Sequence, residues 1–301
     1  MILSVSRRTD IPQYYSDWFF NRMKEGFLYV KNPMNSHQVS KIMLSPDLVD
    51  LVVFWTKNPA PMMRRIGELG EIPYYIQFTL TGYGRDIEPG LPDKHELIRI
   101  FRETADRMVW RYDPVLFNER YPAEYHFRAF EAIAEGICGC TDKVVISFLD
   151  CYGKTKRNMR GIPLETPDEE IMKRTGERFV KTAEKYGMTV ESCAETVDLS
   201  EVGVRHGSCV DPAMIERILG VPVRVKKDKN QRPECGCVES VETGAYDTCL
   251  CGCKYCYAND SEGAVMRRRA EYDVHAPLLC GRVEEGDRIT VRRTSRILTG
   301  E

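Results

Sequence analysis

The sequence lacks any long apolar run. No stretch approaches the roughly 20 apolar residues that a membrane-spanning helix needs, and the N-terminal apolar run is too short for a signal peptide. The chain also lacks an excess of either charge, because its formal net charge is −2. No global field therefore favours binding to nucleic acid or to an anionic membrane. These absences predict a cytoplasmic protein that acts on a small molecule, without a nucleic-acid or membrane partner.

Internal repeats and low-complexity linkers are absent from the 301 residues as well. A chain of this length can bury a substantial core, as one large domain or two small ones. The composition changes near Val221, where a charged, loop-like stretch (226–233) is followed by most of the cysteines. We therefore predict an α/β barrel-like domain over residues 1–220. A cysteine-rich segment over residues 221–301 is predicted to bind an iron–sulfur cluster and to pack back on the barrel rim.

Cysteine, in contrast, is abundant, with twelve residues in the chain. In a reducing cytosol, so many cysteines indicate metal or redox chemistry rather than a disulfide framework. Cys249, Cys253 and Cys256 have the spacing Cys-x3-Cys-x2-Cys, with the aromatic Tyr255 just before the last thiol. Three cysteines so spaced can hold three irons of a [4Fe–4S] cube. The fourth iron would stay open, as S-adenosylmethionine requires for its reductive cleavage to a radical.

The same run allows two other interpretations. Cys253 and Cys256 could join Cys235 and Cys237 in a structural zinc site of four thiolates. A fully ligated electron-transfer cluster would instead take a fourth cysteine such as Cys251. The spacing and the flanking tyrosine favour the open cluster over both alternatives.

A second metal centre is predicted from four further cysteines. Cys193 ends a predicted strand, Cys209 precedes a predicted helix, and Cys235 and Cys237 form a tight pair. Four thiolates suffice for an auxiliary [4Fe–4S] cluster or a structural zinc, and the sequence does not choose between them. The remaining cysteines are interpreted as small apolar fillers or incidental thiols: Cys138, Cys140, Cys151 and Cys280.

Short β-type runs alternate with helix-type segments over the first 200 residues. Several runs are rich in Val, Ile, Tyr and Phe without strict alternation, which is typical of strands buried on both faces. The predicted strands are 2–6, 51–55, 75–80, 108–112, 144–149 and 188–192, with a last β-like piece at 288–293. The predicted helices are 17–24, 58–69, a helix capped by Asp93, 122–135, a helix from Thr166 to about Tyr186, and 212–219. This order predicts a full or partial (β/α) barrel of parallel strands, of the TIM-barrel kind, and a doubly wound open sheet fits the same pattern.

Charged and hydroxylated residues follow the predicted strands. In parallel α/β folds the chemistry lies at the carboxyl ends of the strands, so the gathering of these residues on one rim favours a functional site. Arg7, Arg8 and Asp10 are expected beside the cluster, where a guanidinium can shift its potential or hold a carboxylate. The candidates for contacts with S-adenosylmethionine or substrate are Lys57, Thr79, Thr81, Arg111 and Asp113.

Motifs along nearly the whole chain resemble those of a prokaryotic family with a domain of unknown function, DUF1848. The run Thr248–Asn259 (TCLCGCKYCYAN) also looks like the cluster loop of radical S-adenosylmethionine enzymes. Thr56-Lys57 and Arg111–Pro114 are similar to segments of spore photoproduct lyase and its relatives. The segments that carry the family resemblance are Ser6–Asp10, Phe54–Pro59, Gln77–Thr81, Trp110–Pro114, Ser147–Phe148, Tyr152–Thr155, Cys193–Glu195, Cys235–Cys237 and His275–Thr290.

This resemblance implies a radical-SAM-type barrel and reaction. In most such enzymes the three cysteines follow the first strand, whereas here Arg7–Asp10 hold that place and the cysteines come last. A barrel permits the permuted order if the C-terminal segment folds back over the rim. The enzyme would cleave S-adenosylmethionine with one electron, received from a donor such as a flavodoxin or a ferredoxin. The alternative functions are a zinc-stabilised binding protein and an iron–sulfur electron carrier that does not cleave S-adenosylmethionine.

Overall fold

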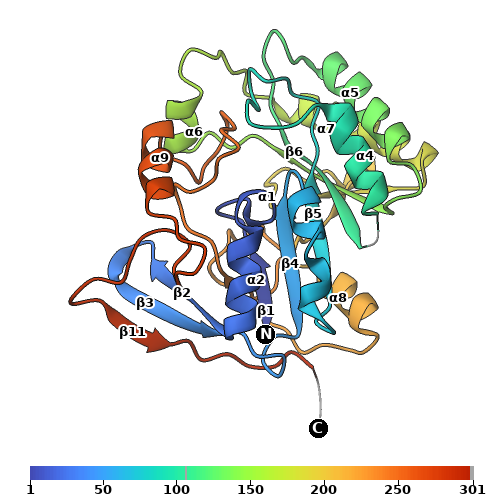
Figure 1. Cartoon of the computed structure of the whole chain (residues 1–301). Helices are drawn as coiled ribbons and strands as arrows, with labels where there is room; N and C mark the ends of the chain where they lie inside the picture. Colours follow the sequence, from blue (N-terminus) through green and yellow to red (C-terminus); the bar gives the residue numbers. More distant parts are fainter. Residues whose placement is uncertain (106, 299–301) are drawn as a thin grey trace.

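An eight-stranded parallel sheet, in the order β10-β1-β4-β5-β6-β7-β8-β9, lies at the centre of the computed structural model, which describes residues 1–105 and 107–298 (Figure 1). All six strands predicted in the first 200 residues are present, and each pairs in parallel with its neighbours. The predicted parallel α/β class is therefore confirmed. The strands are β1 (Ile2–Val5), β4 (Leu51–Thr56), β5 (Tyr74–Thr79), β6 (Met108–Val115), β7 (Lys143–Phe148), β8 (Thr189–Ser192), β9 (Arg205–His206) and β10 (Val241–Glu242).

The two edges of this sheet, β9 and β10, are strands of two residues each. Within the part of the chain that the structure describes, no ladder joins one edge to the other. The pairing therefore shows an open sheet and does not show a closed barrel. Of the strands, β10 comes from the cysteine-rich segment and pairs with β1, so that Leu3 lies opposite Val241.

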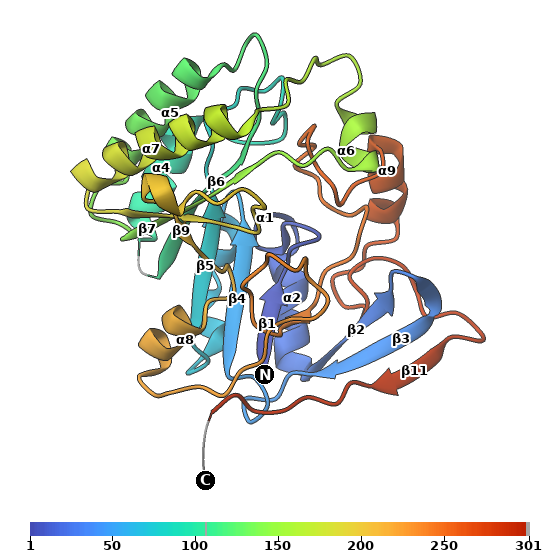
Figure 2. The same ribbon diagram turned by 180° about the vertical axis from the view of Figure 1, so that it is seen from behind.

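Side chains of the sheet alternate between two faces, as strand geometry requires, and both faces are buried. Leu3, Val52 and Phe54 belong to the larger core, with buried residues of α2 (Ser16–Glu25), α4 (Lys94–Glu103), α5 (Ala123–Gly136) and α7 (Glu169–Lys185). Leu51 and Val53 belong to a second core, whose other members come largely from the segment between Ala194 and Ile297. Figures 1 and 2 show the molecule from opposite sides. In Figure 1, α2 lies in front of β1, and in Figure 2 part of the segment between Ala194 and Ile297 lies in front of β1 and β4.

The remaining helices are mostly short. Asp93 caps α4 as predicted, because its carboxylate accepts a hydrogen bond of 2.9 Å from His95 N. The N-cap of α7 is Asp168 rather than Thr166, and the single helix predicted over 58–69 is divided, since Gly67 and Gly70 weaken its second half. These elements are α1 (Ile11–Tyr14), α3 (Ala60–Met63), α6 (Gly153–Asn158), α8 (Pro212–Leu219), α9 (Glu262–Ala270), η1 (Ile66–Leu69) and η2 (Ser200–Val202).

A second, smaller sheet stands beside the first, in the order β11-β3-β2 (Figure 1). The hairpin of β2 (Phe27–Asn32) and β3 (Asn35–Met43) was not predicted, and β11 (Arg288–Val291) confirms the β-like piece near the C-terminus. The predicted boundary near residue 220 stays a prediction, and the last three residues of the segment 221–301 lie outside the described range. None of the helices within 1–105 and 107–298 has the length and apolar character needed to cross a membrane.

His126 of α5 is fully buried between two polar partners, which makes the stability of this core depend on pH. Its Nδ1 lies 2.9 Å from the Tyr112 hydroxyl, and its Nε2 lies 2.7 Å from the Leu116 carbonyl. This arrangement suits a neutral ring that accepts at Nδ1 and donates at Nε2. Burial lowers the pKa of His126 from 6.5 to about 4, because the charged ring would lose its hydration.

We expect the free energy of unfolding to fall as the pH drops from 6.5 towards 4. In this window the unfolded chain takes up a proton at His126 before the folded protein does, so the stability present above pH 6.5 is lost. The loss from this residue approaches about 3 kcal/mol. Urea unfolding of the native protein and of the His126→Gln variant, each at pH 7 and pH 4.5, measures this loss of stability. Parallel losses in the two proteins would contradict the prediction.

Candidate metal and cofactor site

A cavity of about 450 Å³ lies at the carboxyl ends of β1, β4, β5, β6, β7 and β8. Both predicted cysteine sets line it, although they are far apart in the sequence. Cys251, which the spacing left uncommitted, lines it too. The cysteines around the cavity are Cys193, Cys209, Cys235, Cys237, Cys249, Cys251, Cys253 and Cys256.

The loop that carries Cys249 to Cys256 is fixed to the rest of the protein by backbone contacts. The Tyr15 hydroxyl donates to Thr248 O at 2.6 Å, and Gly90 N donates to Cys251 O at 3.0 Å. Glycine is required at position 90, because a Cβ atom there would lie 2.6 Å from Cys251 O. Asn259 Nδ2 donates to Cys249 O at 2.7 Å. The three predicted cluster ligands are thus held on an anchored loop.

In this first set Cys253 is buried, and Cys249 and Cys256 are half-buried. Hydrogen bonding with Cys251 lowers the pKa of Cys249, whereas burial raises the pKa of Cys256 to about 12. The Cys251 Sγ lies 3.8 Å from Oδ2 of Asp10. Burial also raises the pKa of Asp10 to about 6, although its carboxylate accepts from Lys57 N at 2.8 Å and from a threonine and a glutamine. Asp10 therefore lies beside the loop that carries the first set, and its place beside a cluster stays a prediction.

The ammonium group of Lys57 is paired with residues of the protein and is not free to bind a ligand. Its Nζ lies 2.8 Å from Glu88 Oε1 and 2.7 Å from the Tyr255 hydroxyl, which itself donates to Glu88. Glu88 also accepts from Lys94 and, at 2.9 Å, from the hydroxyl of Thr81. Thr81 is consequently buried below the cavity instead of lining it. Burial acts to raise the pKa of Glu88, but the two ammonium groups outweigh it and lower the value to about 2.

The second set of cysteines is drawn together on the second face of the sheet. The Sγ atoms of Cys193 and Cys209 lie 3.1 Å apart. The Cys237 Sγ accepts from the backbone N–H groups of Cys209 and Val210 at 3.3 and 3.4 Å. Hydrogen bonds from Cys209 and Cys235 lower the pKa of Cys237. Within the described residues every cysteine is free, and no disulfide joins the members of this set.

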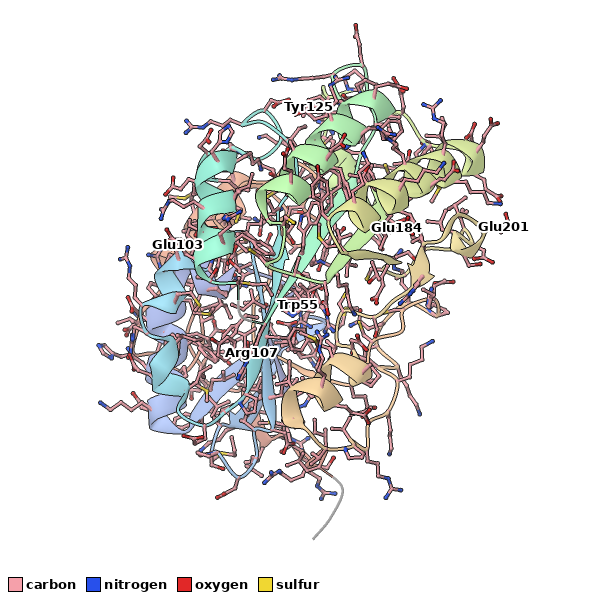
Figure 3. All side chains as sticks on the ribbon, turned by 90° about the vertical axis from the view of Figure 1, so that its right-hand side faces the viewer. Trp55, Glu103, Arg107, Tyr125, Glu184 and Glu201 are labelled. Atoms are coloured by element: carbon pink, nitrogen blue, oxygen red, sulfur yellow. The ribbon has the colours of Figure 1, made fainter. Side chains whose placement is uncertain are left out.

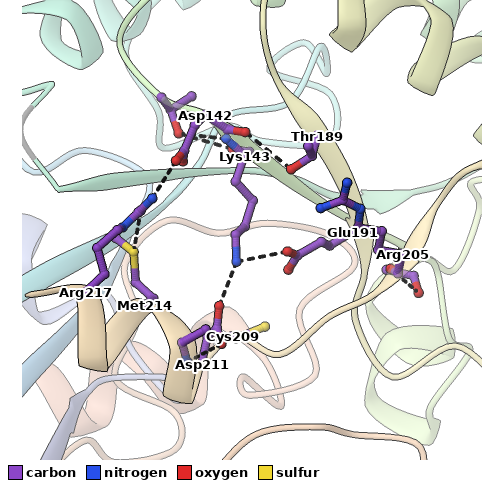
Figure 4. A network of polar contacts seen from close by, with 12 residues as sticks. Asp142, Lys143, Thr189, Glu191, Arg205, Cys209, Asp211, Met214 and Arg217 are labelled. Atoms are coloured by element: carbon purple, nitrogen blue, oxygen red, sulfur yellow. Dashed lines mark hydrogen bonds and ion pairs between the residues drawn. The ribbon is translucent and has the colours of Figure 1, made fainter. Parts of the chain in front are cut away.

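Cys209 is positioned by the start of α8 and the polar contacts around it (Figure 4). Lys143 Nζ lies 2.8 Å from Asp211 Oδ2 and 3.0 Å from Glu191 Oε1, which ties the helix start to β7 and β8. The carbonyl of Cys209 accepts from the Tyr75 hydroxyl at 2.6 Å. The thiol is therefore held by residues of three strands.

Arg111 and Arg7 place two guanidinium groups between the strand ends and the second set. Arg111 Nη1 lies 2.6 Å from the Cys209 Sγ, and its Nη2 forms an ion pair with Asp113. The Trp55 ring, near the centre of the molecule in Figure 3, lies 5.4 Å from the Arg111 guanidinium and 4.9 Å from that of Arg7. The Nη2 atom of Arg7 is buried without a hydrogen-bond partner. This unsatisfied donor marks a place for an anionic group.

Seven of the eight predicted cofactor-binding residues line the cavity, and Thr81 is the exception. Arg8 lies with its guanidinium 5.0 Å from the ring of Tyr246. Two residues near the site were not predicted from the sequence: Glu88, for which no motif exists, and Trp55, which lies within a motif but has no role assigned by it. The residues of the predicted group that line the cavity are Arg7, Arg8, Asp10, Lys57, Thr79, Arg111 and Asp113.

The cysteines around the cavity are suitable ligands for a sulfur-bound metal, but their arrangement is not that of a tetrahedral zinc site. In the part of the chain that the structure describes, no three His, Cys, Asp or Glu side chains are arranged to hold one metal ion. The 3.1 Å between the Cys193 and Cys209 sulfurs is shorter than the about 3.8 Å that a tetrahedron with Zn–S bonds of about 2.3 Å requires. Soft thiolate donors select zinc or iron–sulfur clusters. The cysteines that line the cavity fit a zinc ion or an iron–sulfur cluster, and the unpartnered Nη2 atom of Arg7 fits an anionic ligand beside it.

The fold and the site define a parallel α/β protein in which two cysteine sets face one cavity at the strand ends. Residues 2–258 match the model of a family described as Domain of unknown function (DUF1848), and the chain belongs to this family. The match includes both cysteine sets. No curated protein and no solved structure matches the chain.

Proposed function

We propose that this protein is a radical S-adenosylmethionine-type enzyme that binds a [4Fe–4S] cluster through Cys249, Cys253 and Cys256. The observation that carries the proposal is the convergence of these thiols on the cavity at the strand ends, although in the sequence they lie far from the first strand. The open sheet, with the cysteine-rich segment against its second face, supports a partial barrel with a permuted cluster loop.

When bound, such a cluster supplies the electron for reductive cleavage of S-adenosylmethionine, after which hydrogen is abstracted from the substrate. The chain's own residues would bind and orient S-adenosylmethionine and the substrate. The buried Nη2 of Arg7 would hold a carboxylate, since a charge-assisted hydrogen bond satisfies it. Trp55 would form an apolar wall that limits the access of water. Glu88 and Tyr255 would hold Lys57 in place and so keep the cluster loop against β4.

We propose a second metal centre, an auxiliary [4Fe–4S] cluster or a zinc ion, at Cys193, Cys209, Cys235 and Cys237. The gathering of these four cysteines around one cavity and the Arg111 guanidinium against Cys209 support it. A guanidinium that donates to a ligating sulfur stabilises the thiolate and raises the reduction potential of a cluster.

A second candidate function follows from the position of Cys251. This thiol is buried in the same loop, between Cys249 and Cys253, and it lines the cavity with them. Four cysteines would close the cluster and give an electron carrier that does not cleave S-adenosylmethionine. The formation of 5′-deoxyadenosine in the presence of dithionite separates the two functions, because only the enzyme forms it.

Metal analysis of anaerobically purified protein tests the proposal. We expect a brown protein with about four iron and four sulfide per cluster. The variant C249A/C253A/C256A should lose one such cluster, whereas the matched control C138A/C140A/C151A should keep all of its iron. Retention of all iron in the first variant would refute the assignment, and zinc without sulfide would instead indicate a zinc-stabilised binding protein.

A further inference from the structure

An exposed basic surface lies on and beside α6, next to the cavity at the strand ends, which Tyr152 and Tyr257 also line. The segment 153–160 contains Lys154, Lys156, Arg157 and Arg160 and no acidic residue, in a chain with a net charge of −2. The side chains of Lys156, Arg157 and Arg160 are exposed, and Lys154 is half-buried. Lys154 and Arg157 are paired with Asp247 and Asp260, so among the described residues the positive charge of this segment that has no acidic partner is that of Lys156 and Arg160.

Two exposed tyrosines adjoin these charges. Tyr152 and Tyr257 are 46% and 48% exposed, and their ring centroids lie 6.4 Å apart. Together with Gly153, Lys154 and Arg157 they line a shallow hollow. Exposed aromatic side chains with arginine and a charged rim are typical of protein–protein interfaces. We call this region the α6 surface: Tyr152, Lys154, Lys156, Arg157, Arg160 and Tyr257.

The α6 surface is attached directly to the loop of the first cysteine set. Tyr257 follows Cys256 in the chain, and Asn158 Nδ2 of α6 donates to the carbonyls of Cys256 and Asn259 at 3.2 and 2.9 Å. Arg157 forms an ion pair with Asp260, just beyond that loop. A protein bound here would touch the residue next to a proposed cluster ligand.

We propose that the α6 surface docks the electron donor of the cluster, a small acidic one-electron carrier protein. This inference rests on the proposed function. One electron leaves the reduced carrier, which becomes its one-electron-oxidised form, and enters the oxidised cluster of this chain, while no covalent bond forms or breaks. Opposite charges would steer the encounter, and the tyrosines would provide its central contact.

The rate of cluster reduction by a reduced acidic flavodoxin, measured by stopped flow at low ionic strength, tests this inference. The variant K156E/R160E reverses two exposed charges whose side chains form no hydrogen bond or ion pair with the cluster loop among the described residues, so its fold and cluster should be retained. Its second-order rate constant should fall at least about tenfold, and added salt should slow the native protein. The matched control K24E/R64E places the same charge change on α2 and at the end of α3, and it should stay within about twofold of the native rate.

Dithionite separates a failure of docking from a failure of the proposed function. Dithionite should reduce the cluster of the native protein and of both variants equally, because it needs no docking surface. A native flavodoxin rate in K156E/R160E, with normal dithionite reduction, would overturn the docking inference alone. Equal slowing in both double variants would overturn it too, because net charge would then explain the effect. A protein without iron–sulfur absorption would overturn the proposed function and this inference with it.

Discussion

Replacing Glu88 with Gln is expected to lower the free energy of unfolding by about 3 to 5 kcal/mol. Glu88 is only 2% exposed and forms ion pairs with Lys57 and Lys94. The neutral amide leaves the Lys57 ammonium group buried without its counter-charge, and removal of one partner from a buried pair is strongly destabilising. Urea unfolding of the protein as purified, at pH 7, measures the loss.

Two further variants separate charge from packing at this position. Lys94 is partly exposed, so Lys94→Gln should have a much smaller effect, about 1 kcal/mol. The double variant K57M/E88L removes both charges and should recover much of the loss. Because the pKa of Glu88 is lowered from 4.5 to about 2, its stabilising effect is complete above pH 4.5 and disappears as the pH falls towards 2. If Glu88→Gln loses less than about 1 kcal/mol, water hydrates the Lys57 ammonium group in place of the carboxylate, which would contradict the prediction.

Replacing Arg111 with Met should have a comparable effect, about 3 to 5 kcal/mol, and should also disturb the second cysteine set. Arg111 is 5% exposed and is the ion-pair partner of Asp113, whose carboxylate also accepts from the Ser147 hydroxyl. Its loss also removes the donor to the Cys209 sulfur. Unfolding in urea measures the first effect, and the iron and zinc content per chain measures the second.

The conservative variant Arg111→Lys provides the control. Lysine keeps the charge but cannot reach Asp113 and Cys209 with a planar fork, so we expect an intermediate loss of stability. If the Lys and Met variants lose the same amount, the geometry of the guanidinium matters and its charge does not. Metal content equal to the native value in Arg111→Met would contradict a role for Arg111 at the second set.

The main sheet could be predicted because its strands are buried on both faces. Such strands consist of nearly continuous apolar residues, as in Leu51–Thr56, and this pattern is visible without any structure. In the hairpin 27–43, β2 is mostly half-buried and β3 is largely polar and exposed, so the sequence has no clear period. The strands β9 and β10 have two residues each and exist only because the tertiary structure places them beside β8 and β1.

The candidate site was predictable where chemistry is tied to residue type, and not where it depends on three-dimensional contacts. Cysteine spacing and strand-end position pointed to residues that the structure gathers around one cavity. Glu88 escaped prediction because it lies in an irregular segment and acquires its partners only on folding. Whether Cys251 joins its neighbours as a ligand depends on side-chain geometry that the spacing alone does not fix.

The pairing of β1 with β10 has a consequence for the order of synthesis. The strands β1 and β4 leave the ribosome early, yet most of the segment that covers their second face follows much later, and β10, which completes their edge, follows about 190 residues after β4. At a translation rate of about 5–20 residues per second, the nascent chain exposes an apolar surface and an unpaired edge for about 10–40 s. Each growing chain therefore passes through an aggregation-prone stage, during which chaperones would have to shield it until its last third emerges.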